Sequence, residues 1–260
     1  MSDDWSADLQ GLIASLAPHL VELRRRLFIV LAAVTAGMVI GFIFAEPILN
    51  VLAQPVGGLQ NLQAIELTES IGVYVRVALM VGGILAMPII VYEVVAFVAP
   101  GLLPHEKRML YLSLPLIFLS FIVGAAFAYF IMLPVAIPFL ASFGGIPGNF
   151  RISSYVGFIT RVVFWVGVAF ETPLVIALLA RIGVVTPQQL IKAWRFAVVG
   201  IAIAAALITP TPDPVNMAIV MVPLLALYGL SIILAKLMYR KRLGTQKDGS
   251  APASEANQRV

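Results

Sequence analysis

Long runs of apolar residues dominate the chain, and short polar segments separate them. Six runs are predicted to be helices, at residues 27–45, 73–98, 109–133, 155–182, 194–208 and 215–237. A helix that crosses about 30 Å of hydrocarbon needs about 20 such residues. The runs do not alternate apolar and polar positions, as the strands of a membrane barrel would. The pattern therefore predicts an all-α integral membrane protein with six transmembrane helices.

The fifth run is too short for an ordinary span. Its fifteen residues, 194–208, give a helix of about 22 Å against about 30 Å of hydrocarbon. Either this helix does not cross fully or the bilayer thins around it, at a modest cost per ångström. The proline-rich segment TPTPDP follows at 209–214, and no helix continues through it.

The amino-acid composition also indicates a membrane protein, and its changes along the chain divide the sequence into three parts. Of the 260 residues, 61% are hydrophobic and 12% are charged, whereas soluble domains have about 45–50% apolar and about 25% charged residues. We expect a surface helix or frayed end at residues 1–17, a transmembrane domain at 18–238 and a disordered, polar cytoplasmic tail at 239–260. Residues 46–70 are expected to form a loop on the opposite side.

The distribution of Lys and Arg predicts the orientation. With six spans both termini lie on one side, and all but three of the 17 Lys and Arg residues lie there too. The three on the other side are Arg76, Arg151 and Arg161. Because Lys and Arg concentrate in cytoplasmic loops, both termini are predicted to be cytoplasmic.

Few residues suit catalysis or metal binding. There is no cysteine, and the only histidines are His19 and His105, both outside the apolar runs. H-E-x-x-H, G-x-S-x-G and P-loop patterns are absent from the sequence. We therefore expect no enzyme, no metal, no cofactor and no nucleic-acid partner.

Two carboxylates stand in an otherwise basic belt. Glu22 lies one helical turn before Arg26, and Glu106 precedes Lys107 and Arg108. In one interpretation Glu22 and Arg26 form an exposed pair worth about 0.3–0.5 kcal/mol, and Glu106 is a solvated loop charge. In the other, the two carboxylates bind a cationic ligand, for which a guanidinium is the best match.

Glu171 lies inside the fourth apolar run, two residues before Pro173. A charge at mid-helix costs about 2.5–3.5 kcal/mol on insertion scales, so such residues usually serve a function. Structural alternatives are a neutral buried carboxyl, a group that caps backbone freed by Pro173, or a partner of Arg161. Asp213, in the TPTPDP segment, is a candidate polar residue or a simple turn former.

Five segments in this order resemble the TatC family of twin-arginine protein translocases. They are HLVELRRRL, FVAPGLLPHEKR, GAAFAYFIMLP, GVAFETPLVIALLARIGVVTP and ITPTPDPVNMAIVMVPLLALYGLSI, between about residues 18 and 237. The resemblance implies six helices in a cupped bundle in the bacterial inner membrane, with short fifth and sixth helices. It also implies a receptor and core subunit that binds twin-arginine signal peptides of folded precursors for export driven by the proton gradient.

The same resemblance implies roles for single residues. Glu22 and Glu106 match the carboxylates with which the family recognises signal peptides. Glu171 and Pro173 match its F-E-x-P motif, implicated in contact with the single-helix partners TatA and TatB. Assembly with these subunits, and with further copies of the chain, is expected in the lipid bilayer.

Three positions depart from the family pattern. Met217 replaces a common glutamine, Gly229 replaces the glutamate of a Leu-Tyr-Glu sequence, and Val95 replaces a frequent tryptophan. Two other functions stay open: a secondary transporter with Glu171 as its ion-coupling carboxylate, and an assembly platform without affinity for signal peptides. A missing internal repeat argues against the transporter.

Overall fold

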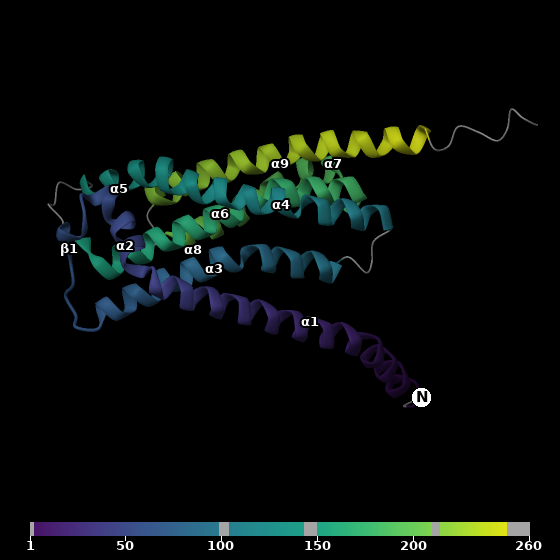
Figure 1. The fold of residues 1–260 in the computed structure, drawn as a ribbon. Coiled ribbons are helices and arrows are strands. Elements are labelled where there is room, and N and C mark those ends of the chain that lie inside the picture. Colours follow the sequence, from purple (N-terminus) through teal and green to yellow (C-terminus); the bar gives the residue numbers. More distant parts are fainter. Residues whose placement is uncertain (1–2, 99–103, 143–149, 210–213, 249–260) are drawn as a thin grey trace, which may run out of the picture. The chain divides into compact units, whose positions relative to one another are not determined.

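The computed structural model describes residues 3–98, 104–142, 150–209 and 214–248 and confirms a mostly helical membrane protein (Figure 1). Within these ranges five helices are long and apolar enough to cross a membrane: His19–Ile43, Glu69–Phe97, Glu106–Ala141, Ile152–Ile182 and Met217–Tyr239. The shorter apolar helix Trp194–Ile208 has 15 residues, the same ones that the sequence predicts for the short fifth run.

The chain forms two compact units. The first unit contains α1 (Asp3–Ile43), α2 (Ala45–Ala53), α3 (Glu69–Val98) and the beginnings of α4 (Pro104–Phe127) and α6 (Ile152–Ile182). The second unit contains the ends of α4 and α6, the π-helix η4 (Ala128–Met132), α5 (Leu133–Ser142), α7 (Pro187–Lys192), α8 (Trp194–Ile208) and α9 (Pro214–Asp248).

In the first unit α1 and α3 lie side by side (Figure 1). Glycines permit this close packing, because their backbones can approach without a Cβ. A Cβ on Gly82 of α3 would lie 2.7 Å from the Met38 nitrogen, and one on Gly41 of α1 would lie 2.8 Å from the Ala78 oxygen. Ala78 and its neighbour Val77 are fully buried. These glycines therefore set the separation of the two helices.

The segment predicted as an outer loop, residues 46–70, is mostly folded. It contains most of α2, two 3-10 turns (η1, Gln54–Val56, and η2, Leu59–Asn61) and the short strand β1 (Leu62–Gln63). Gly57 and Gly58 join the two turns with φ angles of 84° and 108°, which favour glycine. The strand β1 pairs in parallel with β2 (Phe150–Arg151), and this pair of two-residue strands is a small addition to a mostly helical fold.

An ion-pair cluster lies beside this sheet. Arg151 binds Glu69 and, with its Nη2, Glu66 at 2.7 Å. Glu69 is buried and also accepts hydrogen bonds from Ser153 Oγ (3.1 Å) and the Ile65 backbone nitrogen (3.0 Å). The pKa of Arg151 is raised above its ordinary value, first by the hydrogen bond to Glu69 and then by that to Glu66. The cluster fastens the start of α6 to the start of α3.

In the second unit the ends of α4 and α6 interlock through aromatic rings and glycines. Phe121 is fully buried and meets Phe164 edge to face, with ring centroids 6.0 Å apart. A Cβ on Gly167 would lie 2.7 Å from the Phe121 ring, and one on Gly124 would lie 2.6 Å from Phe170. Each glycine therefore makes room for a ring of the opposite helix.

The connection between α6 and α8 follows its local sequence. Gly183 ends α6 in the left-handed conformation, with φ 83°. Thr186 and Gln189 then form a capping box, with Pro187 in the first turn of α7. The Tyr228 hydroxyl of α9 donates a 2.6 Å hydrogen bond to the Leu190 carbonyl, which holds α7 against α9.

One expectation about the last helix needs correction. The last helix is not short: α9 has 35 residues, and its apolar part alone has 23. It runs to Asp248, into the segment for which the sequence predicts disorder, while residues 249–260 of that tail lie outside the described ones. At the other end α1 begins at Asp3 and runs without a break into the first apolar span.

Candidate functional site

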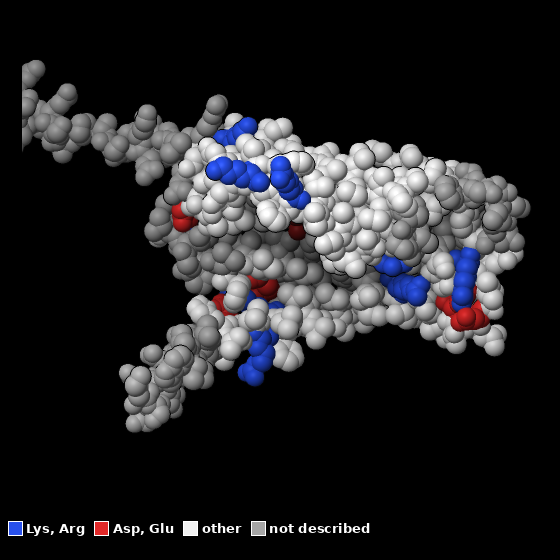
Figure 2. Space-filling view, turned by 180° about the vertical axis from the view of Figure 1, so that it is seen from behind, with Lys and Arg blue, Asp and Glu red and all other residues white. Residues whose placement is uncertain are grey.

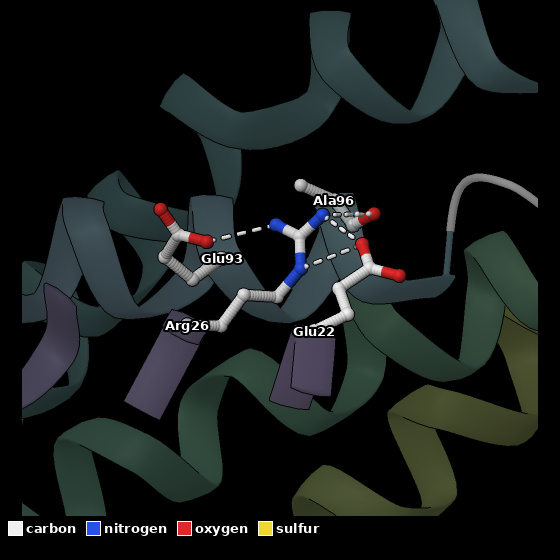
Figure 3. Close-up of polar contacts among 4 residues, drawn as sticks. All are labelled: Glu22, Arg26, Glu93 and Ala96. Atoms are coloured by element: carbon white, nitrogen blue, oxygen red, sulfur yellow. Dashed lines mark hydrogen bonds and ion pairs between the residues drawn. The ribbon is translucent and has the colours of Figure 1, made fainter. Parts of the chain in front are cut away.

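Glu22 and Arg26 form an ion pair on one face of α1, as their spacing of four residues predicts (Figure 3). The guanidinium donates twice to the same oxygen, Oε1 of Glu22, from Nη2 at 2.5 Å and from Nε at 3.1 Å. The Glu22 side chain is 34% exposed and that of Arg26 is 20% exposed. The pair is thus partly buried, and it is more than an isolated surface pair.

A second carboxylate, from α3, holds the same guanidinium. Arg26 Nη1 donates to Oε2 of Glu93 at 2.8 Å, and Nη2 also donates to the Ala96 carbonyl at 3.1 Å. Glu93 is buried, with 8% of its surface exposed. The sequence analysis missed this residue, although a carboxylate inside the apolar run 73–98 was a signal of the same kind as Glu171.

The cluster of Glu22, Arg26 and Glu93 carries one excess negative charge. Two carboxylates surround one guanidinium, and each uses one oxygen to bind it, as Figure 3 shows. Among the described residues, the second oxygens of Glu22 and Glu93 accept no hydrogen bond. The cluster therefore has both the charge and the acceptor atoms to bind a further cation.

Glu106 belongs to the first turn of α4, in the same unit as Glu22. A carboxylate at this end of a helix is stabilised in its charged form by the unpaired backbone N–H groups and the helix dipole. Its neighbours Lys107 and Arg108 are exposed, whereas Glu106 is half-buried. A carboxylate in this position suits recognition of a cationic ligand.

Charged side chains cover little of the described surface. Figure 2 shows the Lys and Arg residues, and the Asp and Glu residues, in small groups on a mostly uncharged face. Arg24 and Arg25, which follow Glu22 on α1, are exposed, in contrast to the partly buried Arg26. Within the run of three arginines, Arg26 is therefore the one that the fold engages.

Glu171 is buried on α6, with 9% of its surface exposed. Its Oε1 has no hydrogen-bond partner among the described residues. A buried polar atom without a partner costs about 1–3 kcal/mol, so Oε1 is a candidate for a polar contact that the described residues do not supply. Because Oε1 has no partner among the described residues, it neither caps backbone freed by Pro173 nor forms an ion pair with Arg161, the two structural alternatives that require a contact.

Pro173 lies inside α6, where it removes one backbone donor. The carbonyl left without its usual partner is that of Ala169, four residues earlier. Next to it, the Phe170 carbonyl receives a 2.7 Å hydrogen bond from the Ser120 hydroxyl of α4. The Ser120 bond therefore reaches the carbonyl beside the freed one and does not replace the donor that Pro173 removes.

An apolar hollow of about 300 Å³ lies between α6, α8 and α9 in the second unit. The side chains that line it include Trp165, Ala169, Thr172, Ile201 and Leu227. Trp165, Ala169 and Thr172 follow one another at helical spacing along α6. Glu171 is not part of this lining, so α6 presents the hollow and the carboxylate on different faces.

The remaining predicted positions add little to the site. Asp213 lies outside the described residues. A Cβ at Gly229, one of the departures from the family pattern, would meet no atom within 4 Å. No group of three His, Asp or Glu residues in the described ranges is placed to hold a metal ion.

The chain is a multi-pass helical membrane protein, because five of its described helices are long and apolar enough to cross a membrane. The family model described as Sec-independent protein translocase protein (TatC) matches residues 18–223. The chain therefore belongs to the TatC family and is a component of the Sec-independent protein translocase. This assignment confirms the resemblance seen in the sequence and favours the translocase over the transporter.

Relatives and solved structures agree with this assignment. The Sec-independent protein translocase protein TatC of Deinococcus radiodurans is 37% identical over 253 residues, which cover 93% of this chain and 92% of the relative. The TatC protein of Aquifex aeolicus is 37% identical over 242 residues, which cover 89% of this chain and 99% of the relative. A crystal structure titled "Twin Arginine Translocase Receptor- TatC" matches with a TM-score of 0.77 at 36% identity, over 85% of this chain and 99% of that one.

Proposed function

We propose that this chain is the receptor subunit of the translocase and binds the paired arginines of signal peptides through Glu22 and Glu106. The observation that carries the proposal is the contact between Glu22 and Arg26, in which the carboxylate already binds a guanidinium with Oε1 alone, while its other oxygen accepts no hydrogen bond from the described residues. A planar guanidinium matches a carboxylate better than an ammonium does. The similarity to the structure titled a receptor supports the same role.

Glu106 is the second carboxylate of this receptor site. It is half-buried in the first turn of α4, in the same unit as Glu22. Two separate carboxylates suit two neighbouring arginines, because each arginine then gains its own charge-assisted hydrogen bonds. A single carboxylate would bind either arginine and would not require both.

The receptor site faces the cytoplasm in this proposal. The chain crosses the bacterial inner membrane six times, with α8 as the short fifth span, and its cupped bundle has both termini inside. The support is the concentration of Lys and Arg on the side of the termini. The 15 residues of α8 then require the bilayer to thin locally or the helix end to remain in the interface.

Glu171 and Pro173 form the contact for single-helix partner subunits of the TatA and TatB type. The buried Oε1 of Glu171, without a partner among the described residues, supports this role, since a polar group of a partner helix would satisfy it. Export is driven by the transmembrane proton gradient, and the chain assembles with these subunits and with further copies of itself.

Binding of a synthetic signal peptide to the full-length protein in nanodiscs tests the receptor role. The wild type is expected to bind an Arg-Arg peptide at least about tenfold more tightly than its Lys-Lys counterpart, a difference of about 1.4 kcal/mol. Glu22→Gln and Glu106→Gln are each expected to remove most of this preference. Glu66→Gln is the matched control, because Glu66 also pairs with an arginine but lies outside the proposed site.

Two results would overturn the receptor role. The first is a wild type that binds neither peptide, and the second is equal binding of both peptides by the wild type and by all variants. Site-directed crosslinking tests the role of Glu171 separately: Glu171→Gln is expected to weaken crosslinks to TatA-type and TatB-type helices without any change in peptide binding. Undiminished crosslinking would argue that Glu171 serves another purpose.

A further inference from the structure

Glu93 is the feature of the cluster that the receptor role alone does not explain. Glu22 already provides one negative charge for Arg26, since its Oε1 lies 2.5 Å from Nη2 and 3.1 Å from Nε of the guanidinium. A buried carboxylate is costly, and replacing a buried ion pair by apolar residues is often neutral or favourable. Glu93 is such a carboxylate: the residue is 8% exposed, and its Oε2 lies 2.8 Å from Arg26 Nη1. Stability is therefore a weak reason to retain it.

Without Glu93, the cluster would have no excess charge. Glu22 and Arg26 alone sum to zero, and the guanidinium would be free to turn both of its donor edges toward Glu22. An arriving arginine would then meet a neutral pair and would have to displace Arg26 before it could bind. With Glu93 present, Arg26 is divided between two carboxylates, and Glu22 keeps an oxygen that accepts no hydrogen bond from the described residues.

We propose that Glu93 is a specificity-determining residue of the receptor site, which neutralises Arg26 and so keeps the charge of Glu22 available for an arginine of the signal peptide. It acts through Arg26 and is therefore a positioning residue for Glu22. The Ala96 carbonyl assists, because it accepts a fourth hydrogen bond from the guanidinium, the second one that α3 receives. This inference rests on the proposed receptor function and assigns the third carboxylate of its site.

The burial of the three side chains supports this division of roles. The exposed fraction of the side chain alone rises from 10% for Glu93 through 20% for Arg26 to 34% for Glu22. The innermost carboxylate is thus the resident counterion, the arginine lies between, and the outermost carboxylate is the one that a peptide can reach. Electrostatic effects inside this cluster are screened less than those between exposed charges.

Binding of the Arg-Arg and Lys-Lys peptides to full-length protein in nanodiscs tests the inference with three variants of Glu93 and Arg26. Glu93→Gln keeps an oxygen that can accept from Arg26 but removes the charge, and it is expected to weaken Arg-Arg binding about tenfold. Glu93→Asp keeps the charge and is expected to retain the preference for Arg-Arg. The double variant Glu93→Gln, Arg26→Gln restores one negative charge on Glu22 and is expected to recover most of the affinity.

Recovery in the double variant separates charge balance from a structural role, because a structural role predicts that the second substitution adds to the damage. Thermal unfolding of every variant, with Glu66→Gln as control, shows that each one is folded. The inference is wrong if Glu93→Gln binds like the wild type, or if the double variant binds no better than Glu93→Gln. A wild type without any preference for Arg-Arg would instead overturn the receptor function, and this inference with it.

Discussion

The Ser120 hydroxyl of α4 donates a 2.7 Å hydrogen bond to the backbone carbonyl of Phe170 in α6. This carbonyl lies one residue before Glu171 and three before Pro173, where the proline disturbs the hydrogen bonding of its own helix. The serine thus connects α4 to the part of α6 that carries the buried carboxylate. The bond joins the two helices through a side chain and a backbone carbonyl, next to the Ala169 carbonyl that Pro173 leaves without its helical donor.

Ser120→Ala is expected to destabilise the protein by about 1 kcal/mol, since it removes this bond between helices. Ser113→Ala is the matched control, because the Ser113 hydroxyl donates to Leu110 within α4 at 2.7 Å and joins no second helix. Thermal unfolding in detergent measures both. Equal effects of the two substitutions would mean that the bond to Phe170 adds nothing to the packing of α4 on α6.

Gly82→Ala is expected to destabilise the packing of α1 against α3 by about 1–3 kcal/mol. The new Cβ would lie 2.7 Å from the Met38 nitrogen and 2.9 Å from the Val34 oxygen, and both of these are backbone atoms that cannot turn aside. Gly72→Ala, in the same helix, has no atom within 4 Å of its Cβ. It is therefore expected to be neutral or slightly stabilising.

Thermal unfolding and native-gel analysis of the purified variants distinguish these two glycines. A Gly82→Ala protein as stable as the wild type would show that α1 and α3 separate at little cost. The contrast with Gly72 removes helix propensity as an explanation, because that effect is the same in both substitutions.

Much of the fold could be predicted from apolar runs alone. The short helix Trp194–Ile208 has the predicted bounds, since a turn and a proline-rich segment limit it on both sides. The strand in segment 46–70 could not be predicted in this way, because Leu62 and Gln63 pair with Phe150 and Arg151, far away in the chain. The extent of α9 to Asp248 could not be predicted either, because polar residues of this kind favour a helix as readily as a disordered tail.

The site was predictable to a smaller extent. Glu22 and Arg26 are four residues apart, so their pairing follows from helix geometry. Glu93 is 67 residues from Arg26, and its contact depends on the glycine-mediated approach of α1 to α3. Local spacing carries no information about such a contact. A carboxylate within an apolar run was nevertheless a sufficient reason to include Glu93 among the candidates.

Glu69 and Glu66 are expected to differ in their importance for stability, although both bind Arg151. Glu69 is buried and also accepts from Ser153 and from the Ile65 backbone, whereas the Glu66 side chain is 63% exposed. Glu69→Gln is therefore expected to lower the Tm clearly and Glu66→Gln hardly at all. Equal shifts in thermal unfolding would contradict this assignment.

The same cluster predicts little pH dependence from its arginine. Because the pKa of Arg151 is raised by Glu69 and Glu66, its contribution to stability is fully present below the ordinary pKa of an arginine. It is lost only as the pH rises through the raised value in the folded protein. A Tm that falls between pH 7 and pH 9 in the wild type, but not in Arg151→Gln, would contradict this.

Glu171→Leu is expected to separate stability from function. The substitution removes a buried carboxyl whose Oε1 has no partner among the described residues, so the purified protein should be between about 0 and 3 kcal/mol more stable. Export of a twin-arginine precursor in cells should fall at the same time, because a partner helix loses its polar contact on α6. Thermal unfolding and an export assay measure the two effects, and Glu171→Gln is expected to be intermediate in both. A Leu variant that is less stable than the wild type would indicate that Glu171 is satisfied within the fold, and its role would then be structural.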